Sequence, residues 1–177
     1  MEDVDALVAS VLPRIKEDVE GLHSGTAEPR IMLWSHRAPV TVFGNAATVC
    51  GWEEIEALSR KLARNFHGSE SCEYEVLAAG GSGELAYIAG IERSVAAVGD
   101  ADPAPFALRV TTVLRREDDE WKIVHRHADP YDEAAVAGRS ISRSWLDAAS
   151  AATAVDPPRP AAATQASKQK ASIVQWP

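Results

Sequence analysis

The sequence lacks the marks of several specialised protein classes. It has only two cysteines in 177 residues, Cys50 and Cys72, which lie far apart and match no metal-ligand spacing. This argues against a disulfide framework or a zinc site, and we expect two reduced, half-buried thiols. No apolar run approaches the roughly 20 residues that cross a bilayer, and the acidic start differs from a basic secretory signal. These absences predict a cytoplasmic protein without a membrane partner.

Positive charge is also scarce. Lysine and arginine number 18 against 26 aspartates and glutamates, which gives a net charge of −8. Because nucleic-acid binding needs a basic surface that neutralises phosphates, this balance predicts no nucleic-acid partner. The length suits one domain with some additional chain, and a domain of this size buries about two-thirds of its unfolded surface without disulfides or metals.

Apolar residues at three- and four-residue spacing predict three helices in the first part of the chain. The first covers residues 4–22, and the second is a short helix over residues 26–33 that Thr26 is expected to cap. The third begins at Gly51 and covers residues 51–66. Its acids come early and its bases late, an order that the helix dipole favours.

Alternating segments separated by glycine-rich or acidic turns predict the strands. One strand precedes the third helix, and four follow it, joined in sequence by short turns. Such turns make hairpins, so we expect an antiparallel sheet segregated from the helices, which is an α+β fold. The strands are expected at residues 39–43, 72–76, 85–98, 106–116 and 121–129.

The composition changes after Tyr131. Residues 133–151 are rich in alanine and predict a C-terminal helix anchored by Ile141, Trp145 and Leu146. From residue 152 the chain is first rich in proline and then small and polar, which predicts a flexible, disordered tail over 152–177. The globular domain is therefore expected to span residues 1–132.

The most informative segment is the last expected strand, WKIVHRHAD at residues 121–129. Successive side chains of a strand point to opposite faces, so one face should carry two large apolar groups followed by three ionisable ones. An apolar row that becomes ionisable at one end is typical of the mouth of a pocket. The residues expected on this face are Trp121, Ile123, His125, His127 and Asp129.

Three helices followed by a curled sheet that ends in Trp-x-Ile-Val-His-x-His resemble the NTF2-like superfamily, in particular its SnoaL-like and ketosteroid-isomerase-like branch. GWEEI at residues 51–55 resembles the Gly-led start of the family's third helix. GELAY at 83–87 resembles the family's Gly-Asp-x-Ala-aromatic pattern, with Glu84 where Asp is usual, and residues 109–127 resemble its closing hairpin. The resemblance implies a cone-shaped sheet wrapped on a long helix, a pocket in the open end of the cone, and a homodimer.

The resemblance does not extend to the steroid isomerase site. Isomerases of this fold use an Asp base on the strand before the third helix, with a Tyr and a protonated Asp as oxyanion donors. Here the strand at residues 40–43 carries no acid, the first helix has no Tyr, and the strand at 108–116 has no Asp. We therefore do not expect that activity, while proton transfer by other groups stays open.

A His beside a carboxylate in a partly dry pocket can transfer protons near neutral pH, so we assign His127 and Asp129 as the catalytic pair. The alternative is that the histidines are structural and that Asp129 only begins a turn. Metal binding by the His-x-His lacks a third ligand identified by spacing, so no metal and no cofactor is predicted. The expected ligand-binding residues are Trp34, His36, Trp52, Tyr87, Arg93, Arg109 and His125.

Two functions fit these features. The first is a SnoaL-like protein that binds a small apolar or carbonyl-bearing molecule, with lyase, isomerase or cyclase activity by acid–base proton transfer. Arg93 and Arg109 are expected among the solvated charges of the outer face or, as the alternative, turned inward, where they would select an anionic or carbonyl ligand; a one-residue bulge decides between the two faces. The second is a noncatalytic association module, because the closing strand also resembles the association domain of calmodulin-dependent kinases. A homodimer is expected in either case.

Overall fold

The computed structural model describes residues 4–44 and 47–132. This part of the chain contains the three expected helices and a sheet, which confirms the α+β fold class. The helices are α1 (Val4–His23), α2 (Glu28–Leu33) and α3 (Trp52–Asn65). The strands are β1 (Thr41–Gly44), β2 (Thr48–Cys50), β3 (Phe66–Ser82), β4 (Leu85–Val98), β5 (Ala104–Glu117) and β6 (Glu120–Pro130).

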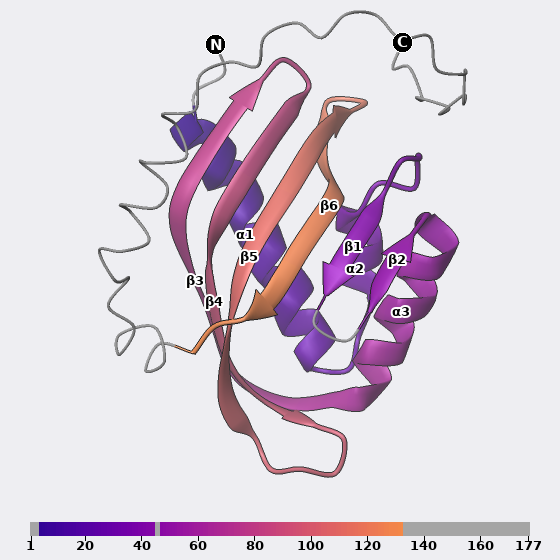
Figure 1. Ribbon diagram of the computed structural model, residues 1–177, viewed down its shortest axis with the longest axis vertical. Helices are drawn as coiled ribbons and strands as arrows, with labels where there is room; N and C mark the ends of the chain where they lie inside the picture. The colour runs from indigo at the N-terminus through magenta and orange to yellow at the C-terminus, as the bar shows by residue number, and fades with distance from the viewer. Residues whose placement is uncertain (1–3, 45–46, 133–177) are drawn as a thin grey trace, which may run out of the picture. The chain divides into compact units, whose positions relative to one another are not determined.

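The strands form one curved, open sheet in the order β2-β1-β6-β5-β4-β3, with α1 across one face and α3 beside β2 (Figure 1). We call the face that α1 covers the inner face and the opposite one the outer face. Neighbouring strands are antiparallel except β1, which runs parallel to β6. The sequence did not predict this parallel pair, because a long connection containing α3 and four strands separates β1 from β6 and no hairpin fixes their direction.

Helix α1 is held to the sheet by a regular apolar stripe. Its buried apolar residues recur every three or four positions, as expected for one face of a helix. Leu7, Val11 and Ile15 pack with inner-face residues of the sheet that include Ile88 and Leu114, both completely buried, whereas Leu22 packs with Ala27 and Ala63. Each such side chain contributes about 1.5–3 kcal/mol on burial, so the stripe fixes α1 against the sheet. The stripe consists of Leu7, Val11, Ile15, Val19 and Leu22.

A β-bulge in β6 decides which of its side chains face α1. Val113 of β5 pairs with His125, whereas the next residue, Leu114, pairs with Ile123. Val124 is therefore an extra residue in β6 with no partner of its own in the register. An extra residue shifts the alternation by one position, so the two halves of the strand present opposite parities to the core.

The consequences of the bulge are visible in the burial of β6. Before it, Trp121 is 7% exposed and faces the core; after it, Arg126 and Ala128 are the buried residues, and His127 is exposed. The prediction that one face runs from Trp121 to Asp129 is therefore wrong beyond Ile123. The polar end of that row lies on the outer face.

The sequence located most elements within a few residues. It gave the bounds of β4 as observed, but it missed the short strand β2, and Ala27 rather than Thr26 is the N-cap of α2. Cys50 is an exposed free thiol, contrary to the half-buried position expected, and Cys72 is half-buried and free. None of the described helices has both the length and the apolar character needed to span a membrane. The helix predicted at 133–151 and the tail predicted at 152–177 lie outside the described residues.

Candidate functional site

Polar and charged side chains gather on the inner face, opposite the second half of α1. Each is at least nine-tenths buried, which is rare for charged groups unless they are paired. They come from four strands and two helices, so the whole fold positions them. We call this group the interior cluster; it consists of Tyr74, Glu92, Ser94, Thr112 and Arg126 on the strands, Asp18 and His23 on α1, and Arg30 on α2.

Two ion pairs balance the charges of the interior cluster. Nη2 of Arg126 donates to Oε2 of Glu92 at 2.5 Å, and Nε of Arg30 donates to Oδ1 of Asp18 at 2.6 Å. Burial disfavours the charge on Arg126, but Glu92 and Asp18 nevertheless hold its pKa above the usual value. Arg126 therefore stays protonated, and each of the two guanidinium groups lies beside one carboxylate.

Tyr74 extends into the cluster over a glycine. It pairs with Glu92 across β3 and β4, and the next inner-face position on β4 is Gly90. A Cβ on Gly90 would lie 2.8 Å from Cε1 of Tyr74 and 2.1 Å from the carbonyl oxygen of Glu75. No larger residue fits without moving the ring or the strand, so the glycine provides the space that the tyrosine occupies.

Four polar groups of the interior cluster have no hydrogen-bond partner among the described residues. They are the hydroxyls of Tyr74, Ser94 and Thr112 and the Nδ1 atom of His23. Leaving a buried polar group unsatisfied costs about 1–3 kcal/mol, and native folds rarely contain several together. These groups therefore keep hydrogen-bonding capacity on the buried face of the sheet.

Burial sets the protonation of two of these groups. It raises the pKa of Tyr74 to about 12, so its hydroxyl is a neutral hydrogen-bond donor at physiological pH. Burial also lowers the pKa of His23, against a smaller opposing effect of the Glu92 charge, so this imidazole is unprotonated near neutral pH. The Tyr74 hydroxyl can therefore donate a hydrogen bond, and the His23 imidazole can accept a proton.

A crevice of about 680 Å³ extends to the cluster from the end of β6. Its walls combine outer-face residues, such as Arg93 and Val95, with the inner-face residues Ser94 and Phe106. The Phe106 ring meets the ring of His23 edge-on, with the two centroids 5.5 Å apart. The crevice therefore reaches the interior cluster at Ser94, with Phe106 between the open volume and His23.

The predicted catalytic residues do not face this interior. His127 is exposed on the outer face, and Asp129 forms an ion pair with Arg109 rather than a contact with His127. The bulge in β6 is the physical reason, and the expectation that these groups face an enclosed hollow is wrong. Their catalytic role stays a prediction that this arrangement does not support. Among the described residues, no three His, Cys, Asp or Glu side chains gather as metal ligands would.

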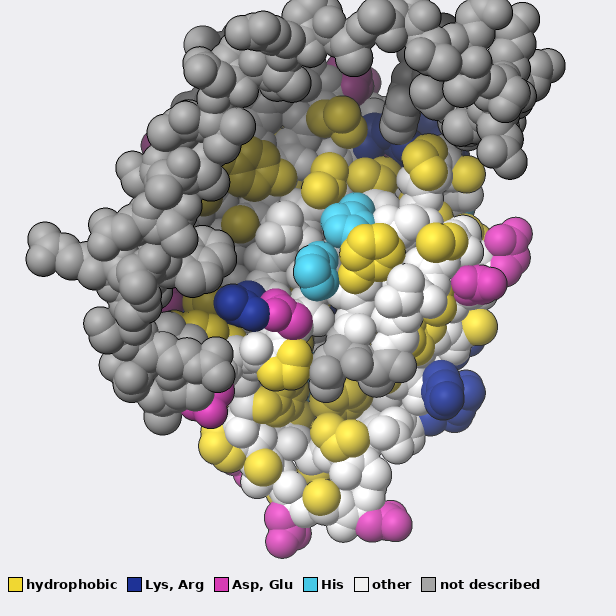
Figure 2. Space-filling view, viewed as in Figure 1, with side chains coloured by type: hydrophobic (Ala, Val, Ile, Leu, Met, Phe, Trp, Pro, Cys, Tyr) yellow, Lys and Arg dark blue, Asp and Glu magenta, His cyan; other side chains and the backbone are white. Residues whose placement is uncertain are grey.

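The histidines of β6 lie instead on an open surface with aromatic and charged neighbours (Figure 2). His125 is half-buried, and its Nδ1 atom forms a 2.7 Å hydrogen bond with the Thr41 hydroxyl. Phe43 meets both His125 and His127 edge-on, with centroid distances of 5.0 and 5.9 Å. Partial burial and the neighbouring His127 lower the pKa of His125. His127, Arg109 and Asp129 line a groove of only about 220 Å³.

Two further predicted ligand residues share this outer face. Arg93 is half-buried and pairs with Glu75 at 2.9 Å, and Tyr87 is 42% exposed with its ring against Gly80. Arg93 and Arg109 therefore follow the solvated alternative and not the inward one. The structure brings Arg109, His127 and Asp129 together, but on the face opposite to the interior cluster.

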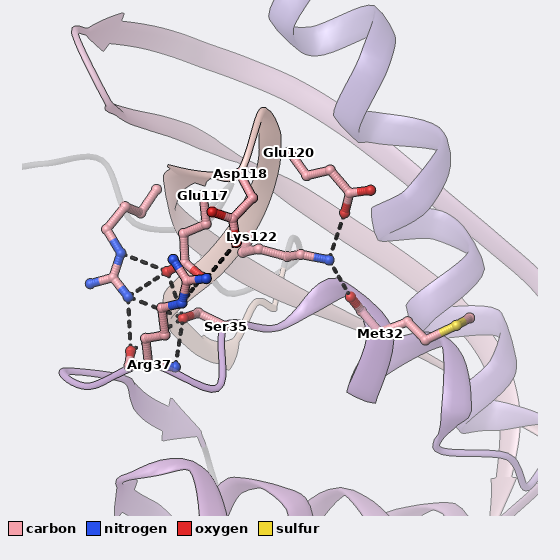
Figure 3. Close-up of polar contacts among 8 residues, drawn as sticks. Met32, Ser35, Arg37, Glu117, Asp118, Glu120 and Lys122 are labelled. Carbon is pink, nitrogen blue, oxygen red and sulfur yellow. Dashed lines mark hydrogen bonds and ion pairs between the residues drawn. The ribbon is translucent and has the colours of Figure 1, made fainter.

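The remaining predicted ligand residues lie near a second cleft of about 680 Å³ between α1, α2 and the β5–β6 turn. Trp34 is 1% exposed and belongs to the core, whereas His36 is exposed and stacks on Trp52 with the ring centroids 3.8 Å apart. Figure 3 shows the charged wall of the cleft, where Lys122 donates to the Met32 carbonyl oxygen at 3.0 Å. The three aromatic residues thus do not line one pocket with the β6 histidines.

The charged groups at this cleft are paired with one another (Figure 3). Lys122 also pairs with Glu120 at 2.7 Å, and Arg37 pairs with Asp118. Glu117 accepts hydrogen bonds from Ser35 and Arg115, both at 2.7 Å; although partial burial opposes it, these bonds lower the pKa of Glu117. The network joins the segment after α2 to the β5–β6 turn, which is a structural role.

Sequence reasoning missed the interior cluster, although one signal was present. Asp18 continues the apolar stripe of α1, three residues after Ile15 and four before Leu22, where an acid has no place unless it is paired. Glu92 likewise shares the parity of the buried residues Ile88 and Ser94 on β4. A charge on each of two apolar faces would have pointed to a buried polar site.

The sequence matches the SnoaL-like domain family over residues 24–131. The chain belongs to this family. No protein of curated function matches the SnoaL-like chain by sequence.

Solved structures place the fold among NTF2-like proteins. An NTF2-like protein of unknown function from Pseudomonas putida KT2440 is 19% identical, with a TM-score of 0.58, 74% of this chain covered and 92% of the other. A provisionally named ketosteroid isomerase from Parabacteroides distasonis is 16% identical, with a TM-score of 0.56 and coverages of 75% and 92%. A provisionally named calcium/calmodulin-dependent protein kinase type II association domain from Thiobacillus denitrificans is 20% identical, with a TM-score of 0.54 and coverages of 67% and 93%. At these identities the likeness shows the fold alone.

Proposed function

We propose that this SnoaL-like domain binds a small, uncharged carbonyl compound in the interior cluster. The observation that carries the proposal is the pair of buried hydroxyls of Tyr74 and Thr112, which lie close enough to interact with one another and have no well-formed hydrogen bond to any described residue. A guest with a carbonyl oxygen would accept hydrogen bonds from these groups and remove the cost of leaving them unmade.

The charge balance of the cluster favours a neutral guest. Arg126 is already neutralised by Glu92, and Arg30 by Asp18, so no cation is left to compensate a buried anion. A carboxylate bound here would have to displace Glu92 from Arg126 or stay uncompensated, and either change is costly at such burial. The ligand class that fits is therefore a ketone, aldehyde or neutral ester.

The protonation states fit proton transfer on such a compound. Tyr74 can donate a hydrogen bond to a carbonyl oxygen, which stabilises the negative charge that develops there when a neighbouring C–H is ionised. His23 is the unprotonated imidazole of the cluster, at its end beside Phe66 and Phe106, with Nδ1 free among the described groups. A lyase, isomerase or cyclase reaction would use Tyr74 as the oxyanion donor and an unprotonated base such as His23, in place of the roles that the sequence assigned to His127 and Asp129.

The test compares two matched probes, acetophenone and benzoate, which share a phenyl ring and differ in charge. Backbone amide shifts in two-dimensional NMR spectra are followed during titration of the full chain with each probe. We expect saturable shifts at Tyr74, Ser94 and Thr112 with acetophenone and none with benzoate. Tyr74→Phe should weaken acetophenone binding about fivefold, the effect of one net hydrogen bond.

Tyr87→Phe is the matched control and should leave the affinity unchanged, because that side chain is exposed on the outer face, opposite to the interior cluster. Equal binding of benzoate would overturn the neutral-ligand assignment. Absence of saturable shifts at the cluster, or shifts confined to the outer face, would overturn the site itself.

A second function, association with another copy of the chain, is favoured by the outer face. Large apolar side chains stand exposed there around the β6 histidines, an arrangement typical of protein contact surfaces (Figure 2). One of the structural neighbours carries the name of an association domain. The exposed residues are Phe43 at 42%, Leu77 at 63%, Leu85 at 47% and Tyr87 at 42%.

Light scattering coupled to size-exclusion chromatography tests the association. We expect a dimer for the natural chain and a monomer for Leu77→Glu, since a charge would be buried in the contact. Met32→Glu, an equally exposed change at the other cleft, should stay dimeric. A natural chain that is monomeric at micromolar concentration would refute this second function and leave ligand binding untouched.

A further inference from the structure

The interior cluster is closed to solvent, so a ligand needs a route to it. Glu92 is 1% exposed, Ser94 2% and His23 3%, and no guest could reach these groups without some side chain moving. The crevice at the end of β6 is the place where open volume comes closest to the cluster, because Ser94 and Phe106 belong to its lining and also face inward.

The register of the sheet places these groups in one row. Cys72 of β3 pairs with Ser94 of β4, and Ser94 pairs with Phe106 of β5. The next inner-face row contains Tyr74 and Glu92, so Ser94 is the member of the cluster in the row of Phe106, and the other strand residues begin one row, or roughly 7 Å, further in.

Two phenyl rings, those of Phe66 and Phe106, pack against the His23 ring at the end of the cluster that faces the crevice. Phe66, at the start of β3, lies 4.6 Å from the ring of His23, and Phe106 lies 5.5 Å from the same ring. The two phenyl rings are 6.4 Å apart. Of these rings, only Phe106 also lines the crevice, and it is half-buried rather than buried.

We propose that Phe106 is the gate of the interior site and sets the size of the ligands that enter. Rotation of its side chain toward the crevice uses volume that is already open, and it exposes Ser94 and the edge of His23 without moving a strand. Rotamer changes of half-exposed side chains are fast and need no unfolding. This proposal rests on the proposed function only for the class of ligand that enters. The rotation of the Phe106 side chain is a property of the free protein.

A thiol placed behind the gate tests the opening without any ligand. The natural cysteines are replaced by Cys50→Ser and Cys72→Ser, and Ser94→Cys supplies a single reporter whose labelling by methyl methanethiosulfonate is timed by mass spectrometry. We expect Phe106→Ala to speed labelling by about an order of magnitude, because the local opening no longer has to displace a ring. Phe106→Trp should slow it, and Phe106→Leu, the milder change, should fall between Ala and the natural residue.

A second reporter separates the gate from general loosening. This reporter is Ala86→Cys in the same cysteine-free background. The natural Ala86 is 4% exposed and lies in the main core, several rows from Phe106. Equal acceleration at both reporters, or no acceleration at Ser94→Cys, would overturn the gate. Acceleration at Ser94→Cys alone supports it.

The same variants distinguish the gate from the proposed function. If the cluster binds acetophenone, Phe106→Ala should raise the association and dissociation rates together and change the affinity little, whereas Tyr74→Phe should change the affinity. If labelling responds to Phe106 but acetophenone does not bind, the gate stands and the ligand assignment fails. If acetophenone binds with rates that ignore Phe106, the ligand assignment stands and the gate is wrong.

Discussion

The two faces of one sheet carry the same kind of pair in opposite surroundings. Arg126 and Glu92 meet on the inner face with side chains 10% and 2% exposed, whereas Arg109 and Asp129 meet on the outer face at 58% and 39%. On the outer face, water would solvate either group if the other were absent. On the inner face each charge is tolerable only because of its partner, so position and not chemistry gives the pair its importance.

The difference also separates the two functions. The inner face combines neutralised charges with unpartnered hydroxyls, which suits recognition of a small neutral molecule. The outer face combines exposed apolar groups with solvated ions, which suits contact with another protein surface. One sheet can serve both because alternate residues of each strand belong to different faces.

Removing one arginine from each pair should give the largest contrast. Arg126→Met leaves Glu92 buried without its partner and should lower the free energy of unfolding by about 3–5 kcal/mol. Arg109→Met should cost less than about 1 kcal/mol, since Asp129 regains water. Urea denaturation of both variants measures the difference.

The double variant Arg126→Met, Glu92→Leu sharpens this contrast. It removes both inner charges and should recover much of the loss, because no ion is left uncompensated. Similar losses of unfolding free energy for Arg126→Met and Arg109→Met would show that an unpaired carboxylate costs no more on the inner face than on the outer face.

The glycine under Tyr74 should give the next largest effect. Gly90→Ala places a Cβ 2.1 Å from the Glu75 carbonyl oxygen, and overpacking of this kind costs about 1–3 kcal/mol. Gly44→Ala is the control, because its Cβ would meet no atom closer than 3.5 Å. Thermal unfolding of the two variants checks the order, and an unchanged midpoint for Gly90→Ala would mean that Tyr74 does not depend on this space.

Histidines on the two faces predict a smaller, pH-dependent effect. An unfolded chain binds a proton on His23 near pH 6.5, whereas burial lowers the folded pKa, so below pH 6.5 the unfolded state binds more protons. Stability should therefore fall as the pH drops from 7.5 to 5.5. His125 has the same sign of shift from weaker burial and should add less.

Urea titrations at both pH values measure this slope. His23→Gln should remove the larger part of the loss on acidification, and His125→Gln the smaller part. The reverse order would place the dominant buried imidazole on the outer face and would contradict the protonation state assigned to His23.

The sequence predicted elements whose apolar residues repeat at a regular local spacing. It did not predict the face of the sheet on which side chains lie after a bulge, where one extra residue reverses the alternation. The helix at residues 4–22 and the strand at 85–98 followed from spacing alone, because burial of a stripe or a face selects the pattern. Val124 carries no mark that it is a bulge, yet it transfers His127 and Asp129 from one face to the other. The interior cluster is also non-local: Asp18 and Arg126 are separated by most of the domain, and only the folded sheet with α1 on it brings their charges together.

The smallest effect on stability should come from the residue most important for binding. The Tyr74 hydroxyl is buried without a partner, so Tyr74→Phe removes a desolvated group and should leave the free energy of unfolding unchanged or raise it by up to about 1 kcal/mol. Tyr87→Phe, on the outer face and 42% exposed, should be neutral in both stability and binding. If the Tyr74 hydroxyl instead stabilises the free protein, Tyr74→Phe should lower the free energy of unfolding. That outcome, measured by urea denaturation without ligand, would mean that the hydroxyl is already satisfied and has no bond left to offer a guest.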